Sequence, residues 1–141
     1  MSIYADTSFI VSLYVRDGHS GAAVQRMAAQ PRIWLTPFHS TEWIHAVERQ
    51  VFQKHLSRHE TQQIYAEFEA DRKSGVWVEV ALPESAFAVC CDLGRSYAAS
   101  IGNRTLDTLH VASALELKAR SFWTFDERQA RLARAAGLKT E

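Results

Sequence analysis

The sequence predicts an α/β protein with three layers, α/β/α, in which helices cover both faces of a mainly parallel central sheet of about four to five strands. Short apolar runs alternate with longer amphipathic segments along the whole chain, which is the pattern of strands that alternate with helices. No internal repeat or low-complexity segment interrupts this alternation. The 141 residues, of which 47% are hydrophobic, suit a single domain spanning residues 1–141.

Each expected strand is a short apolar run that stops at a polar residue or at proline. The run Ile3-Tyr4-Ala5 stops at Asp6, and the second run is closed by Pro37. The run that starts at Ser121 stops at Asp126. We therefore expect strands at residues 3–5, 33–36, 76–80 and 121–125, and a short last strand at 138–140.

Each expected helix shows apolar residues at helical spacing or carries a start or stop signal. In the segment that begins at Ser40, Trp43, Val47 and Val51 recur on one helical face. Gly94 interrupts a later helix without necessarily ending it. We expect helices at residues 8–15, capped by Thr7 or Ser8, and at 20–30, 40–55, 59–72, 83–102, 106–119 and 126–136.

Four carboxylates stand where expected strands end or where helices begin. Asp6 directly follows the first strand, and Glu42 lies in the first turn of the helix after the second. Asp126 falls at the end of the fourth strand, and Asp107 opens the buried helix that precedes it. Because ligands of parallel α/β sheets bind outside the carboxyl ends of the strands, all four acids can reach one edge of the sheet.

Each acid taken singly also has a purely structural explanation. Asp is a favoured N-cap, and a carboxylate in a first helical turn complements the helix dipole. The set as a whole is more informative, because carboxylates crowded together repel one another and tolerate burial only with a compensating cation. Oxygen ligands without Cys or His favour Mg²⁺ or Mn²⁺, which suit phosphodiester hydrolysis.

Composition places weak limits on the substrate and on the cellular compartment. The 16 Lys and Arg balance the 16 Asp and Glu, whereas proteins that bind nucleic acids are usually basic. If four acids bind metal, 12 remain against the 16 bases, so the remaining surface is basic. Arg104 and Arg128 are candidates to contact phosphates. A solvated face is the usual outcome for the row of arginines that contains Arg128, so Arg104, beside Asp107, is the better candidate. No signal peptide or membrane-spanning run is visible, which predicts a cytoplasmic protein without membrane contact.

Four sequence blocks resemble the PIN-domain family, and specifically the VapC-type toxins of VapBC toxin–antitoxin pairs. The third and fourth blocks are the more specific ones, and a matching end, LARAAGL, follows at 132–138. No acid stands just before Asp107, where some members have one, so the resemblance supports one metal ion more firmly than two. The blocks are YADTSF at 4–9, STEW at 40–43, LDTLHVASA at 106–114 and FWTFDERQ at 122–129.

The resemblance implies a PIN-like fold and an endoribonuclease that needs Mg²⁺ or Mn²⁺. It also implies a homodimer that a cognate antitoxin protein holds inactive. Metal-activated water would cleave RNA to leave a 5′-phosphate and a 3′-hydroxyl. In this interpretation Thr124 and Ser8 support the site by hydrogen bonding, and the catalytic, metal-binding acids are Asp6, Glu42, Asp107 and Asp126.

Two alternatives remain open at this point. The chain can be a PIN-like binding module without strong catalysis, which Mn²⁺ titration would detect. It can also be a phosphatase whose nucleophile is Asp6. That chemistry generally uses a second acid two residues further on, where this chain has Ser8, and this counts against it.

Overall fold

The computed structural model describes residues 2–141. These residues form two compact units, which we call unit 1 (residues 2–6 and 81–141) and unit 2 (residues 7–80). The strands are β1 (Ser2–Ala5), β2 (Arg32–Leu35), β3 (Trp77–Glu79), β4 (Ser121–Trp123) and β5 (Lys139–Thr140). The pairings of β1 with β4, of β4 with β5 and of β2 with β3 are parallel. The strand order in the five-stranded sheet is β3-β2-β1-β4-β5. The predicted three-layer α/β class with a parallel sheet is therefore confirmed, whereas the single domain over residues 1–141 stays a prediction.

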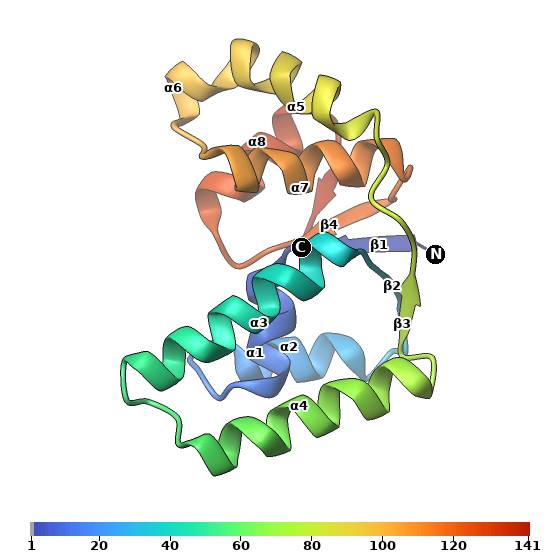
Figure 1. The fold of residues 1–141 in the computed structure, drawn as a ribbon. Helices are drawn as coiled ribbons and strands as arrows, with labels where there is room; N and C mark the ends of the chain where they lie inside the picture. Colours follow the sequence, from blue (N-terminus) through green and yellow to red (C-terminus); the bar gives the residue numbers. More distant parts are fainter. Residues whose placement is uncertain (1) are drawn as a thin grey trace. The chain divides into compact units, whose positions relative to one another are not determined.

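Unit 1 contains three strands and the helices of the C-terminal half of the chain (Figure 1). Its strand register pairs Tyr4 with Phe122, and the two rings stack with centroids 5.7 Å apart. Helix α5 packs along α7, whose residues 108–114 are all buried. The elements are β1 (Ser2–Ala5), α5 (Ala86–Leu93), the π-helix η1 (Gly94–Ala98), α6 (Ala99–Ile101), α7 (Thr105–Glu116), β4 (Ser121–Trp123), α8 (Glu127–Ala135) and β5 (Lys139–Thr140).

Unit 2 is built around α1, which contacts each of the other three helices of this unit. Trp43 and Phe68 stack with ring centroids 4.1 Å apart, and the Tyr14 ring meets both edge-on. The elements of unit 2 are α1 (Thr7–Tyr14), α2 (Ser20–Met27), β2 (Arg32–Leu35), α3 (Pro37–Phe52), α4 (Arg58–Lys73) and β3 (Trp77–Glu79).

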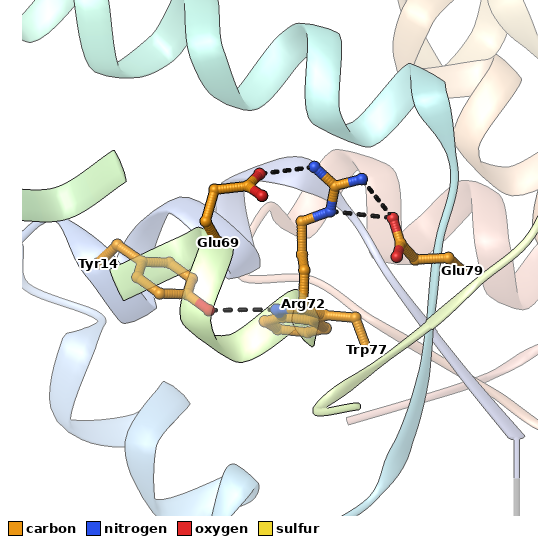
Figure 2. Close-up of polar contacts among 5 residues, drawn as sticks. All are labelled: Tyr14, Glu69, Arg72, Trp77 and Glu79. Atoms are coloured by element: carbon orange, nitrogen blue, oxygen red, sulfur yellow. Dashed lines mark hydrogen bonds and ion pairs between the residues drawn. The ribbon is translucent and has the colours of Figure 1, made fainter. Parts of the chain in front are cut away.

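Figure 2 shows two sets of polar contacts in unit 2, one between Tyr14 and Trp77 and one between Arg72 and two glutamates. The Tyr14 hydroxyl accepts a hydrogen bond from Trp77 Nε1 at 3.1 Å and donates one to Asp71 at 2.5 Å. Burial, together with the bond to Asp71, raises the pKa of Tyr14 far above its usual range. Nearer the surface, the Arg72 guanidinium forms ion pairs with both Glu69 and Glu79.

Helix α3 begins at Pro37 rather than at Ser40, so the predicted start of this helix is wrong. The Thr36 side chain caps the helix, and His39 bonds back to the Thr36 backbone in a capping box. Proline fits the first helical position because the missing N–H would have no helical partner there. As a result, Glu42 lies in the second turn of α3 and not in its first turn.

The predicted helix at 83–102 also differs from the structure. Regular helix begins only at Ala86, and at Gly94 the chain continues as one π-helical turn instead of being interrupted. The left-handed residue Gly102, with φ of 78°, ends this run.

Strand β4 stops at Trp123, two residues before the predicted end at Phe125. Among residues 2–141, no helix has both the length and the apolar content that crossing a membrane requires.

Candidate metal-binding site

Asp6 occupies the position just beyond β1 and is almost completely buried, with 3% of its surface exposed. Its backbone N–H donates to the Trp123 carbonyl at 3.0 Å, so the β1–β4 ladder reaches as far as this residue. The Thr124 hydroxyl, just beyond β4, donates to Asp6 Oδ2 at 2.5 Å. The carboxyl ends of two neighbouring strands therefore bring a buried acid and a hydroxyl donor together.

Thr124 also fixes the segment that carries Asp126. Its hydroxyl oxygen accepts a hydrogen bond from the Asp126 backbone N–H at 3.0 Å. Asp126 is exposed and is the N-cap of α8, because its Oδ1 accepts from the Gln129 backbone N–H at 3.0 Å. The capping explanation is therefore confirmed for Asp126. Its site role stays a prediction, which the cap leaves open because one carboxylate oxygen is enough for capping.

Asp107 is half-buried in the first turn of α7 but is not the cap of that helix. The N-cap position belongs to Arg104, whose side chain makes no capping bond. The Asp107 carbonyl accepts a hydrogen bond from Gln129 Nε2 at 3.1 Å. Within unit 1, hydrogen bonds therefore connect the segments of all three aspartates, from Asp6 through Thr124 and Asp126 to Gln129 and Asp107.

Glu42 belongs to unit 2, where its carboxylate has a specific partner. The Thr7 hydroxyl, 7% exposed at the start of α1, donates to Glu42 Oε1 at 2.7 Å. Thr7 is the residue that follows Asp6 in the chain. The sequence interpretation treated Thr7 only as a possible cap, and nothing in its spacing indicated a partner on α3.

The remaining predicted site residues lie near these segments with less definite contacts. Ser8 is an exposed residue of α1, and its carbonyl accepts from the Ser12 hydroxyl at 3.1 Å. Arg104 and Arg128 are exposed, and neither forms an ion pair within residues 2–141. The Asn103 side chain donates to the Arg128 carbonyl at 3.4 Å, which links the two segments that carry these arginines.

Two further polar residues of unit 1 are buried and stand close in sequence to predicted site residues. Gln129 is 3% exposed and bonds to both the Asp126 and Asp107 segments. It stands three residues after the capping Asp126, which is the spacing of a capping box and was visible in the sequence. His110, also 3% exposed, lies one turn after Asp107 and bonds through Nδ1 to the Tyr4 hydroxyl at 2.7 Å.

The chemistry of these donors fits a hard divalent cation such as Mg²⁺ or Mn²⁺. Carboxylate oxygens are its preferred ligands, and an acid as buried as Asp6 is tolerated better beside positive charge. Among residues 2–141, however, no group of three or more His, Cys, Asp or Glu side chains is gathered closely enough to form a ready-made metal site. The oxygens suit the ion in kind, and a complete ligand set remains a proposal.

Comparison with solved structures finds proteins with a similar fold. VapBC2 from Rickettsia felis, solved with a DNA fragment from its promoter, matches with a TM-score of 0.68 at 14% identity over 100% of this chain and 98% of that one. FitAcB from Neisseria gonorrhoeae matches with a TM-score of 0.70 at 17% identity, over 98% and 95% of the two chains. VapC20 from Mycobacterium tuberculosis, a toxin that cleaves the sarcin-ricin loop, also reaches 0.70, at 18% identity over 96% and 95%.

At these identities the structural matches establish the fold alone. A search of curated proteins found no significant match. The model of the PIN domain family, in contrast, matches residues 3–135, which is nearly the whole chain. The chain therefore belongs to the PIN domain family.

Proposed function

We propose that this protein is a Mg²⁺- or Mn²⁺-dependent endoribonuclease, acting as the toxin of a toxin–antitoxin pair. The observation that carries the proposal is the buried Asp6 carboxylate, held by Thr124 and connected by hydrogen bonds to the segments of Asp126 and Asp107. Membership of the PIN domain family adds support. So does the structural likeness to VapC20, which is described as a toxin that cleaves the sarcin-ricin loop.

In this proposal, Asp6, Asp107, Asp126 and Glu42 would hold the metal. When bound, the ion would activate a water molecule and stabilise the charge that develops on the phosphate. Thr124 orients the Asp6 carboxylate, because its hydroxyl hydrogen points at Oδ2. The bond from Thr7 restricts the Glu42 carboxylate in a similar way, next to Asp6 in the chain.

We further propose that Arg104 and Arg128 bind the RNA backbone. Both guanidinium groups are exposed, and neither is neutralised by an ion pair within residues 2–141, so both are available to phosphates. Phosphate contacts of this kind contribute affinity that falls as salt is added, without reading the base sequence. Ser8 stays a candidate supporting residue in this proposal.

The proposal is tested with the purified full-length chain and end-labelled RNA in Mg²⁺ or Mn²⁺. Asp6→Asn should lower the cleavage rate by at least about 100-fold, since metal catalysis is worth several kcal/mol. Asp92→Asn is the matched control, because Asp92 is exposed on α5 and, within residues 2–141, forms an ion pair only with Arg95. Cleavage by Asp6→Asn at the wild-type rate would contradict the mechanism. A wild type that binds no Mn²⁺ and cuts no RNA would instead favour a PIN-like binding module.

A cognate antitoxin and a homodimer also belong to the proposal. The structural match to VapBC2 supports an antitoxin partner, because VapBC proteins are toxin–antitoxin pairs. Co-expression with the protein encoded by the adjacent reading frame should yield a stable complex in which RNA cleavage is suppressed. Light scattering of the isolated chain should give the mass of two copies. A monomer of 15.9 kDa at all concentrations would contradict the dimer.

A further inference from the structure

Gln129 is buried at the centre of the polar network of unit 1 and is the third residue of α8. Its backbone N–H donates to Asp126 Oδ1 at 3.0 Å. Its side-chain Nε2 donates to the Asp107 carbonyl at 3.1 Å, and its Oε1 lies 3.5 Å from the Thr124 hydroxyl. One residue therefore contacts the segments that carry two of the proposed metal ligands and the hydroxyl that holds a third.

Helix capping does not explain the Gln129 side chain. The cap of α8 uses only the backbone N–H at this position, which any residue other than proline supplies. A glutamine amide is usually exposed, because burying it is costly unless its polar atoms find partners. The Gln129 side chain is only 3% exposed, so its burial must be explained by hydrogen bonds other than the cap.

The bond to Asp107 fixes which way the amide points. A flipped amide would place Oε1 against the Asp107 carbonyl oxygen, where neither atom can donate. With Nε2 on that carbonyl, Oε1 is directed toward Thr124. The Thr124 hydroxyl has one hydrogen, and the shorter contact, at 2.5 Å, gives it to Asp6. The amide therefore lies against Thr124 and ties the first turn of α7 to the start of α8.

We propose that Gln129 is a positioning residue that holds the Asp107 and Asp126 segments at the spacing needed for one divalent ion. Gln129 would not bind the ion itself. Its side chain acts through the Asp107 carbonyl, whereas the bond to the Asp126 carboxylate comes from its backbone N–H. This inference rests on the proposed function, because it assumes that these acids bind metal. Its consequence is specific: losing the Gln129 side chain should weaken metal binding more than it disturbs the fold.

The test replaces the amide with side chains that cannot reach the Asp107 carbonyl. Gln129→Met keeps the length and helix preference without polar atoms, and Gln129→Asn keeps the amide on a shorter stem. The control is Leu132→Ala on the same helix, where a side chain with 1% exposure is removed from apolar surroundings. Mn²⁺ affinity of the full chain is measured by calorimetry, and folding is followed by the melting temperature.

We expect Gln129→Met and Gln129→Asn to bind Mn²⁺ about 10- to 100-fold more weakly than wild type, as is usual when an outer-shell partner is lost. Leu132→Ala should melt at lower temperature but, where folded, bind Mn²⁺ as wild type does. Equal affinity in wild type and both Gln129 variants would overturn the positioning role while leaving the proposed function intact. Failure of the wild type itself to bind Mn²⁺ would overturn both.

Discussion

Unit 1 and unit 2 both bury apolar side chains, but unit 1 also buries a carboxylate and an amide that belong to the proposed site. In unit 2, Trp43 and Phe68 are 0% and 4% exposed and stack on each other. In unit 1, Asp6 and Gln129 are each 3% exposed, yet they are held by hydrogen bonds. Burial of apolar area is a direct source of stability, whereas a buried polar group does little more than recover its bonds to water.

The comparison teaches that equally buried side chains have different roles: Trp43 and Phe68 stabilise the fold, whereas Asp6 and Gln129 belong to the proposed site. In unit 2, large aromatic side chains pack together into a core. A folded protein of any function requires a packed core. Unit 1 places the Asp6 carboxylate and the Gln129 amide at buried positions where apolar side chains would stabilise the fold more. Polar groups retained at such positions point to a functional constraint, since stability alone does not explain them.

The largest effect should follow from breaking the aromatic core of unit 2. Trp43→Ala should lower the free energy of unfolding by about 3–5 kcal/mol, because the cavity lies against Phe68 and Tyr14. Urea denaturation followed by circular dichroism measures the change. Phe52→Ala on the same helix is the control, and with 86% of the side chain exposed it should change stability by less than about 0.5 kcal/mol. Similar losses in both variants would remove the contrast between the core and its surface.

A smaller loss of stability, but a larger loss of function, should follow from breaking the network of unit 1. Thr124→Val keeps the shape of the side chain and removes the hydroxyl that bonds to Asp6. We expect a cost of about 1–3 kcal/mol and clearly weaker Mn²⁺ binding, because a buried carboxylate loses a donor. Thr124→Ser restores the hydroxyl and should recover Mn²⁺ affinity. If Thr124→Val binds Mn²⁺ as wild type does, this hydroxyl does not position Asp6 for metal.

A buried polar pair also exists in unit 2, and it sharpens the comparison because it serves a helix end. Thr36 and His39 are both buried and form the capping box of α3 through three hydrogen bonds to each other. Thr36→Ala should cost about 1 kcal/mol, the usual value of an N-cap. Mn²⁺ affinity should stay unchanged. Thr41→Ala, which removes an exposed hydroxyl from the same helix, should have almost no effect on thermal melting. A loss of Mn²⁺ binding in Thr36→Ala would show that capping and function are not separate here.

The sequence allowed the fold class and the approximate element order to be predicted because strand ends are marked by local signals. Asp6 and Pro37 interrupt apolar runs, and such interruptions do not depend on distant residues. The start of α3 was placed too late because proline was taken only as the end of a strand. In the structure the same residue is the first residue of a helix. One local signal was therefore compatible with two structures, and the capping bonds of Thr36 decided between them.

The partners of the site residues were harder to predict than the acids themselves. The Thr124 bond to Asp6 spans 118 positions and the Gln129 bond to Asp107 spans 22, so neither follows from local spacing. Thr124 was expected to support the site only because the family resemblance implied it. Gln129 was missed because a residue three positions after a cap has a complete local explanation. Long-range bonds of this kind become visible only when the strands and helices are assembled.

The smallest expected effect concerns an exposed charge network in unit 2, which lies outside both the core and the proposed site. Hydrogen bonds from Arg58 and then from Tyr65 lower the pKa of Glu48 below its usual value of 4.5. A carboxyl whose pKa is lowered by folding stabilises the protein above pH 4.5. That contribution disappears as the pH falls through the lower pKa of the folded state. Glu48→Gln should therefore melt slightly below wild type at pH 7, and the difference should vanish at lower pH.

Salt should also reduce this difference, because both partners are exposed to solvent. Glu67→Gln is the control, since Glu67 is an exposed acid of the neighbouring helix α4 without an ion pair within residues 2–141. Its melting temperature should follow wild type at every pH. If Glu48→Gln melted further below wild type in acid than at pH 7, the direction of the pKa shift would be wrong. Folding would then raise the pKa of Glu48 instead of lowering it.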